Sequence, residues 1–304
     1  MESPENSFVT VDNAISEYML EQRIRGNSDK TLKYYEYVFV KFKKYCNCTL
    51  VSEIDLPTCK KYLICLMDCG INSVSVQSYV RGFRAFLSWL YSCGYLTENL
   101  SLEFKLPKAH KAVINILTSK EIDLLLSYFD TSTFLGSRNL SMCLLMLGSG
   151  LRCGEVVSLE CDCVHLDEKY VIVDGKCDKE RIVPISQEMV YKLLDYISKR
   201  DFDKNRQRCR MFFCMSDGEP ITNETVKNLF RDLKRINGLE RIYPHLLRHT
   251  FATMYLENGG NIYSLQRILG HTSLEMVKRY LHMSRYAILK DFDRFSPCGE
   301  RKIE

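Results

Sequence analysis

The last quarter of the chain concentrates side chains that can act on a phosphodiester. His245 and Arg248 stand three residues apart, Gly270-His271 follows, and Tyr280 comes nine residues after His271. A phenol can act as a nucleophile, a guanidinium can hold an anion, and an imidazole can move a proton. This set of side chains predicts attack by a tyrosine on a phosphodiester.

Two upstream segments carry charges that suit the same reaction. The glycines around Gly150 predict a tight turn, after which a helix begins near Arg152. A helix N-terminus favours an anion, and a guanidinium matches phosphate oxygens. Glu155 stands three residues on, close enough to orient Arg152. Lys176 lies at the expected tip of a hairpin, from which its ammonium could stabilise an anion or donate a proton. Taken singly, each charge could be an ordinary surface charge, and Tyr280 an ordinary core tyrosine.

The first hundred residues predict a helical domain, placed at 10–106. Apolar residues recur every three or four positions in four segments, which are 13–24, 31–45, 56–69 and 73–91. The fourth segment also carries Arg81, Arg84 and Ser88 on a polar face. Basic residues one turn apart can straddle a phosphate backbone, although a plain solvated face is the alternative.

A linker is expected at 107–116, where helical periodicity stops at a proline and basic residues follow. Its lysines, Lys108 and Lys111, could lie along DNA. The remainder, 117–304, predicts an α+β domain, so the chain as a whole is expected to be mainly α with a small antiparallel β-sheet. Residues 170–173 and 181–185 predict the hairpin, helices surround it, and the apolar spacing of 285–304 suggests a tail that docks on a neighbouring protomer.

Bulk composition sets broad limits on the class of protein. The chain has 304 residues, a net charge of +4 and 14 cysteines. Its polar, acidic start lacks a signal segment, which favours the cytoplasm and reduced thiols. The close pairs Cys46/Cys48 and Cys161/Cys163 lack the two-residue gap of zinc sites, so no metal site is expected. A His245–His249 metal pair is also disfavoured, and no apolar run reaches the ~20 residues of a membrane span.

The order of the motifs resembles the tyrosine recombinases, the phage integrase and Xer family. Local contexts that carry the likeness are Gly-Leu-Arg-x-x-Glu-x-x-x-Leu at 150–159, Lys-Glu-Arg-x-x-Pro at 179–184, His-x-x-Arg-His-Thr-Phe-Ala at 245–252 and Tyr-x-His at 280–282. The resemblance spans about residues 10–295. It implies a helical core-binding domain followed by a catalytic domain. With few residues before Asn13, the simple form without a separate arm-binding domain is expected.

The resemblance also implies a role for each site residue. Tyr280 would attack the phosphorus and leave a 3′-phosphotyrosyl link with a free 5′-hydroxyl. The remaining roles fall to side chains that hold the phosphate or move protons: Arg152 and Arg248 on the two non-bridging oxygens, Lys176 as the acid for the 5′-oxygen, His245 as acceptor of the tyrosine proton or aid to the acid, His271 as a hydrogen-bond donor to the phosphate, and Glu155 as the orienting group. Cys177 stands where relatives commonly have glycine, which makes Lys179 the alternative acid, and Val277 stands where threonine is common.

Covalent capture conserves the energy of the phosphodiester, so neither a nucleotide cofactor nor a metal is expected. The implied partners are double-stranded DNA recombination sites bound by a homotetramer that holds two duplexes; accessory proteins are compatible with this, and a membrane is not expected. The implied function is site-specific integration or excision of a mobile element, or Xer-like resolution. Two alternatives remain, a type IB topoisomerase-like strand transferase and a DNA-binding protein that does not cleave.

Overall fold

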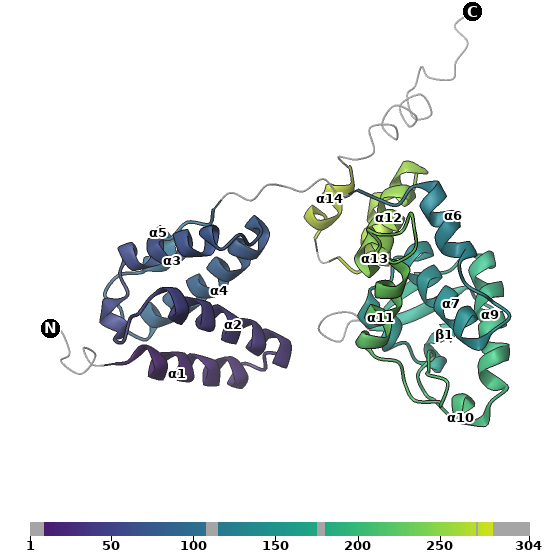
Figure 1. Ribbon diagram of the computed structural model, residues 1–304, viewed down its shortest axis with the longest axis horizontal. Helices are drawn as coiled ribbons and strands as arrows, with labels where there is room; N and C mark the ends of the chain where they lie inside the picture. Colours follow the sequence, from purple (N-terminus) through teal and green to yellow (C-terminus); the bar gives the residue numbers. More distant parts are fainter. Residues whose placement is uncertain (1–8, 108–114, 175–179, 272, 282–304) are drawn as a thin grey trace, which may run out of the picture. The chain divides into compact units, whose positions relative to one another are not determined.

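The computed structural model describes residues 9–107, 115–174, 180–271 and 273–281 (Figure 1). The chain divides into two compact units, Met1–Val113 and Ile114–Glu304. The division falls inside the segment 107–116. Residues 108–114, and with them Lys108 and Lys111, lie outside the described residues.

The first unit is helical, and its longer helices begin at side-chain caps. Thr10, Ser28, Asp55 and Asn72 each accept a hydrogen bond from the backbone N–H three residues on, which satisfies one of the donors that a helix start leaves unpaired. The helices are α1 (Val11–Ile24), α2 (Asp29–Tyr45), α3 (Leu56–Asp68), α4 (Ser73–Ser92) and the short α5 (Leu100–Glu103), which the sequence did not predict.

Aromatic side chains fill the core of the first unit. Tyr18 meets Phe39, Phe86 and Trp89 edge-to-face, an arrangement that the ring quadrupoles favour. α4 packs against α1, α2, α3 and α5, so it is the centre of the unit. At Gly82 an added Cβ would lie 2.7 Å from a methyl carbon of Val38, so the close approach of α2 and α4 depends on this glycine.

The second unit combines helices with one small antiparallel sheet. Strands β1 (Val164–His165), β2 (Tyr170–Asp174) and β3 (Glu180–Pro184) pair in that order. The helices are α6 (Ser119–Ser127), α7 (Phe134–Gly148), α8 (Cys153–Val157), α9 (Gln187–Asp201), α10 (Lys204–Gln207), α11 (Asn223–Leu233), α12 (Pro244–Glu257), α13 (Ile262–Leu269) and α14 (Glu275–Leu281). The predicted fold class is confirmed, and β1 is an addition because a two-residue strand leaves no periodic pattern.

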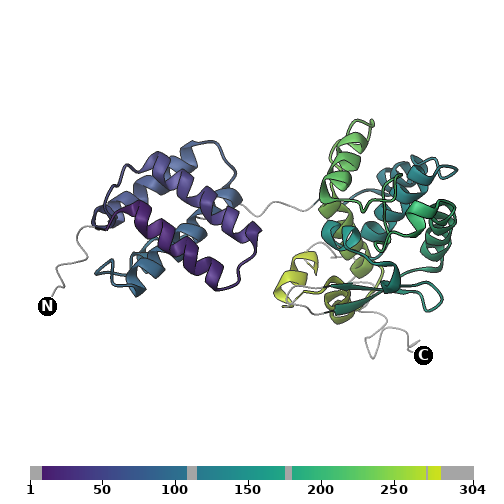
Figure 2. The same cartoon turned by 90° about the horizontal axis from the view of Figure 1, so that it is seen from below.

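The core of the second unit is built around the apolar helix α7. α7 is buried along much of its length and packs against α9 and α12. One face of the sheet joins this core through Val171, Val173 and Val183, while Ile182 of β3 points to solvent. β3 also packs against α13, as Figure 2 shows at the edge of the unit. The packing brings the starts of α8 and α12 and the end of α13 close to one another.

Candidate active site

The buried carboxylate of Glu155 is the centre of the candidate site. Its Oε2 accepts a hydrogen bond from the backbone N–H of Arg152 at 2.7 Å, and its Oε1 accepts one from Nη1 of the same arginine at 2.6 Å. Arg152 is the N-cap of α8, as the glycine turn before it predicts. Gly150 in that turn has a φ of +68°, and a Cβ there would lie 2.5 Å from the ring of Phe251. Both its conformation and its surroundings therefore require glycine.

Arg181 of β3 binds the other side of the same carboxylate. Its Nη1 and Nη2 donate to the two oxygens of Glu155 at 2.9 and 2.8 Å, and its Nε donates to the carbonyl of Ile268 at 2.7 Å. The sequence did not single out Arg181 as a site residue. It stood in the motif Lys-Glu-Arg-x-x-Pro at 179–184, and that motif was the signal that could have found it.

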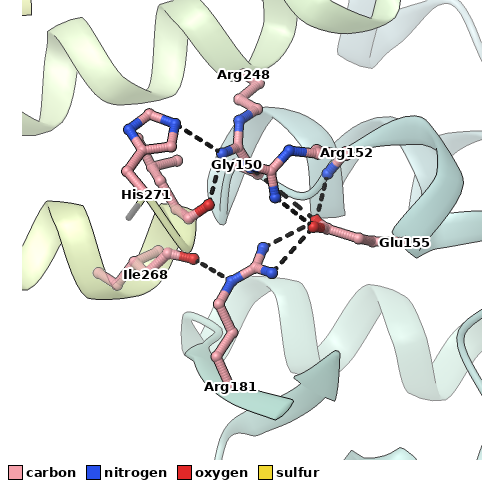
Figure 3. Close-up of polar contacts among 8 residues, drawn as sticks. Gly150, Arg152, Glu155, Arg181, Arg248, Ile268 and His271 are labelled. Carbon is pink, nitrogen blue, oxygen red and sulfur yellow. Dashed lines mark hydrogen bonds and ion pairs between the residues drawn. The ribbon is translucent and has the colours of Figure 1, made fainter. Parts of the chain in front are cut away.

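Arg248 closes the site from α12 (Figure 3). Its side chain is buried, Nη1 donates to the carbonyl of Gly150 at 2.5 Å, and Nη2 donates to that of Leu269 at 2.6 Å. The same Nη2 lies 3.2 Å from Nε2 of His271 and Nη1 lies 4.0 Å from Glu155. The structure thus brings Arg152, Glu155, Arg248 and His271 together from α8, α12 and the turn after α13.

The cluster carries more positive than negative charge. Three guanidiniums, those of Arg152, Arg181 and Arg248, surround the one carboxylate of Glu155. Burial by itself would raise the pKa of Glu155, but hydrogen bonds from Arg181 and Arg152 outweigh it and hold the pKa below the usual value. Burial and then the charge of Arg152 lower the pKa of Arg248 to about 10, so it is still charged at neutral pH. The excess charge suits an anion.

Tyr280 lies on α14 beside this cluster. Its side chain is 1% exposed, and its hydroxyl oxygen lies 2.8 Å from Nδ1 of His249. Its ring packs in the same apolar cluster as Leu269, whose carbonyl accepts a hydrogen bond from Arg248. The burial matches the core tyrosine that its sequence context allowed. The partner His249 was not predicted as a site residue, although it stands in the motif at 245–252 and was considered there only as half of a disfavoured metal pair.

The remaining catalytic candidates are His245, Lys176 and Lys179. His245 is exposed in the first turn of α12, three residues before Arg248. Lys176 and its alternative Lys179 lie outside the described residues, as does the tail 285–304. Among the described residues, no group of three or more His, Cys, Asp or Glu side chains is arranged to hold a metal ion. In that same part of the chain, no helix is both long enough and apolar enough to cross a membrane.

The DNA-binding candidates on α4 share one hollow of about 320 Å³. Arg81, Arg84 and Ser88 line it together with Ala85 and Ser101. Arg81 and Ser88 are exposed, and Arg81 donates to the side chain of Gln77 at 3.0 Å. Arg84 is half-buried and donates through Nε to the carbonyl of Ser101 at 2.8 Å. Part of its hydrogen-bonding capacity therefore holds α5 in place.

Comparison with known proteins assigns both units. Residues 115–286 match the model of the phage integrase family, and residues 12–106 match the phage integrase SAM-like domain. The tyrosine recombinase XerD of Listeria monocytogenes is 29% identical over 282 residues, which cover 90% of this chain and 94% of the relative.

Two solved structures share the fold at low sequence identity. The Tn1549 transposon integrase, in complex with a circular intermediate DNA, has a TM-score of 0.78 and 19% identity, with 92% of this chain and 99% of the other covered. The lambda integrase tetramer bound to a Holliday junction has a TM-score of 0.70 and 17% identity, with 89% and 79% covered.

A helical unit followed by an α+β unit with this sequence likeness defines the class of tyrosine-type site-specific recombinases. The chain belongs to the phage integrase family.

Proposed function

We propose that the protein cuts and rejoins DNA through a 3′-phosphotyrosine intermediate on Tyr280. The observation that carries this proposal is the cluster around Glu155, in which Arg152, Arg248 and His271 converge from separate elements with an excess of positive charge. A scissile phosphate is an anion that such a cluster would bind. Tyr280 packs in the same apolar cluster as Leu269, whose carbonyl binds Arg248, and its phenol is the group that could attack the phosphorus.

The strand-cleavage step exchanges one phosphodiester for another. The hydroxyl oxygen of Tyr280 forms a bond to phosphorus, the bond from phosphorus to the 5′-oxygen breaks, and that oxygen takes up a proton while tyrosine loses one. Arg152 and Arg248 would bind the non-bridging oxygens, whose charge grows in the transition state. A charge-assisted hydrogen bond contributes roughly 1.5–3 kcal/mol, so loss of either arginine should slow cleavage at least ~10-fold. The reverse reaction rejoins the strand.

Histidine and lysine side chains would transfer the protons of the tyrosine and of the leaving 5′-oxygen. We infer that His245 accepts the tyrosine proton or assists the acid, that His271 donates a hydrogen bond to the phosphate, and that Lys176 protonates the 5′-oxygen. Nδ1 of His249 contacts Tyr280 in the structure, which makes His249 a further acceptor for the phenolic proton. Glu155 keeps Arg152 in place from the side away from the phosphate.

A covalent adduct tests the nucleophile. Duplexes with a random central sequence and a nick near the scissile position should trap the parent chain on DNA, and sequencing the trapped strands would give the preferred site. Tyr280→Phe should form no adduct, while Tyr255→Phe, a change at a partly buried tyrosine of α12, should form it normally. Absence of an adduct with the parent chain would favour a DNA-binding protein that does not cleave.

A modified leaving group tests the acid. A 5′-bridging sulfur departs without a proton, so this substrate should restore cleavage by Lys176→Ala but not by Arg152→Ala. Lys179→Ala is the matched control and should cleave the natural substrate at the parent rate. If instead Lys179→Ala is slow and rescued by sulfur, the acid is Lys179.

We further propose that the chain works on double-stranded DNA as a homotetramer that joins two duplexes. The support is family membership, together with relatives of the same fold that were solved on DNA, one of them as a tetramer. The tail 285–304 would dock on the neighbouring protomer. Truncation after Arg285 should leave DNA binding intact and abolish synapsis; truncated protein that still recombines would remove the tail from this role. Relaxation of supercoiled DNA by single protomers would favour the topoisomerase alternative.

A further inference from the structure

One side chain joins three elements of the candidate site. Arg181 extends from β3, its two terminal nitrogens bind Glu155 of α8, and its Nε binds the carbonyl of Ile268 near the end of α13. The side chain is 10% exposed. A planar guanidinium can reach three acceptors in fixed directions, whereas a lysine ammonium offers one nitrogen. The geometry at this point therefore depends on an arginine and not only on a positive charge.

Arg181 and Arg248 together hold the end of α13. The last carbonyls of a helix have no partner within the helix. Here the carbonyl of Ile268 accepts from Arg181 and that of the next residue, Leu269, accepts from Arg248. His271 follows directly after the cap, so the two guanidiniums fix the turn from which its imidazole reaches Arg248.

The cap residue Gly270 leaves the space that Arg181 fills. Its φ is +61°, and an added Cβ would lie 3.0 Å from Cδ and 3.1 Å from Nε and Nη1 of Arg181. These distances are shorter than ordinary van der Waals contact. Glycine at this position therefore serves the left-handed turn and the seating of the arginine at once.

We propose that Arg181 is a positioning residue for strand cleavage: through Glu155 it orients Arg152, and through the end of α13 it places His271, so that both meet one phosphate. Each of its three side-chain nitrogens already has a protein acceptor, so it acts through these partners and not on the substrate. The inference rests on the proposed cleavage chemistry.

Arg181→Lys tests the proposal, with Arg241→Lys as the matched control. Arg241 also binds a glutamate, Glu121, through two nitrogens and donates to the carbonyl of Ile116, but these contacts are at the start of α6 and not in the candidate site. The readouts are DNA affinity, thermal unfolding and the single-turnover cleavage rate. We expect Arg181→Lys to bind DNA within ~2-fold of the parent and to cleave at least ~10-fold more slowly, and Arg241→Lys to cleave normally.

Substrates with an uncharged methylphosphonate at the scissile position distinguish a loss of positioning from a general loss of activity. In each methylphosphonate diastereomer a methyl group replaces one non-bridging oxygen, so the arginine that binds this oxygen loses its function there. The diastereomer on which Arg152→Ala slows cleavage least identifies the non-bridging oxygen that Arg152 binds. On that diastereomer the Arg181→Lys penalty should shrink several-fold. An equal penalty on all substrates, or parent-like cleavage of the natural phosphodiester, would overturn the proposal.

Gly270→Ala provides a second route if Arg181→Lys does not fold. It keeps the charge and displaces the guanidinium, so it should show the same substrate-dependent penalty. Gly259→Ala is its control, because Gly259 also has a positive φ, +85°, but no atom lies within 4 Å of an added Cβ. Failure of the parent chain to form an adduct on Tyr280 would refute the proposed function itself, and a parent-like Gly270→Ala would refute only the role of Arg181.

Discussion

The starts of α6 and α8 are built alike but differ in what surrounds them. In both, a glutamate in the first turn accepts a hydrogen bond from the N-cap backbone N–H: Glu121 from Thr118 and Glu155 from Arg152, each at 2.7 Å. In both, an arginine distant in sequence binds the glutamate through two nitrogens and donates to a backbone carbonyl. The local motif is thus nearly the same at the two helix starts.

The difference lies in the number of charges and in their burial. Around Glu121 one arginine, Arg241, balances one carboxylate, and the arginine side chain is 40% exposed. Around Glu155 three guanidiniums share one carboxylate, and the arginine that corresponds to Arg241, Arg181, is only 10% exposed. The N-cap also differs, since the Thr118 hydroxyl accepts a hydrogen bond from the backbone of Glu121 and a guanidinium at Arg152 has no acceptor. A balanced pair holds a helix start in place, whereas an unbalanced cluster can bind an anion.

Of the substitutions that test this difference between the two helix starts, Glu155→Gln should have the largest effect on stability and on cleavage. A neutral amide cannot accept from all the donors around it, which leaves buried guanidiniums uncompensated. We expect the free energy of unfolding of the second unit to fall by about 3 kcal/mol and cleavage to fall at least ~10-fold.

The single tryptophan allows each unit to be followed during that measurement. Trp89 is the one tryptophan of the chain and lies in the core of the first unit. In urea, its fluorescence follows the first unit and far-ultraviolet circular dichroism follows both. An earlier loss of dichroism with an unchanged tryptophan transition would locate the damage in the second unit; parent-like curves would contradict the central role of Glu155.

Arg152→Thr should separate capping from phosphate binding. Threonine restores the acceptor that Thr118 provides at α6, so the stability of the second unit should stay within ~1 kcal/mol of the parent. The phosphate would lose one guanidinium, so single-turnover cleavage should slow at least ~10-fold. Normal cleavage by this variant would mean that Arg152 is only a helix cap.

Glu121→Gln should have a smaller effect, on stability alone. Its amide oxygen can still accept from the Thr118 backbone N–H, so the capping box is kept, but the ion pair with Arg241 near the surface is lost. We expect a loss of about 1 kcal/mol in unfolding free energy and a cleavage rate within ~2-fold of the parent. A slow variant would show that the α6 cap also influences the active site.

The smallest effect should be the pH dependence of the stability that Glu121→Gln removes. Hydrogen bonds from Arg241 lower the pKa of Glu121 from 4.5 to about 2. A carboxylate with a lowered pKa stabilises the fold above its unfolded-state pKa, and this contribution disappears as the pH falls through the folded-state pKa. The stability gap between the parent and Glu121→Gln should therefore be full at pH 7 and shrink between pH 4.5 and pH 2. A gap that widens in this range would contradict the pairing.

Local pattern predicted most of the elements. Apolar spacing predicted the four longer helices of the first unit, and β-rich runs flanking a turn predicted the hairpin β2–β3. These features depend on neighbours in sequence, because helix and strand periodicity repeat over a few residues. Short elements such as α5 and β1 were missed, since they owe their conformation to the packing around them.

For the candidate site, the sequence by itself determined the chemical types and their order: Arg152 after a glycine turn, Arg248 on a helix, His271 after a cap glycine and Tyr280 beyond it. Only the tertiary structure decided that Arg181 shares Glu155 with Arg152 and that His249 contacts Tyr280. Residues 155 and 181 meet because β3 packs against α13 beside the start of α8. Such contacts between distant segments depend on how the elements pack, and no short sequence pattern encodes that packing.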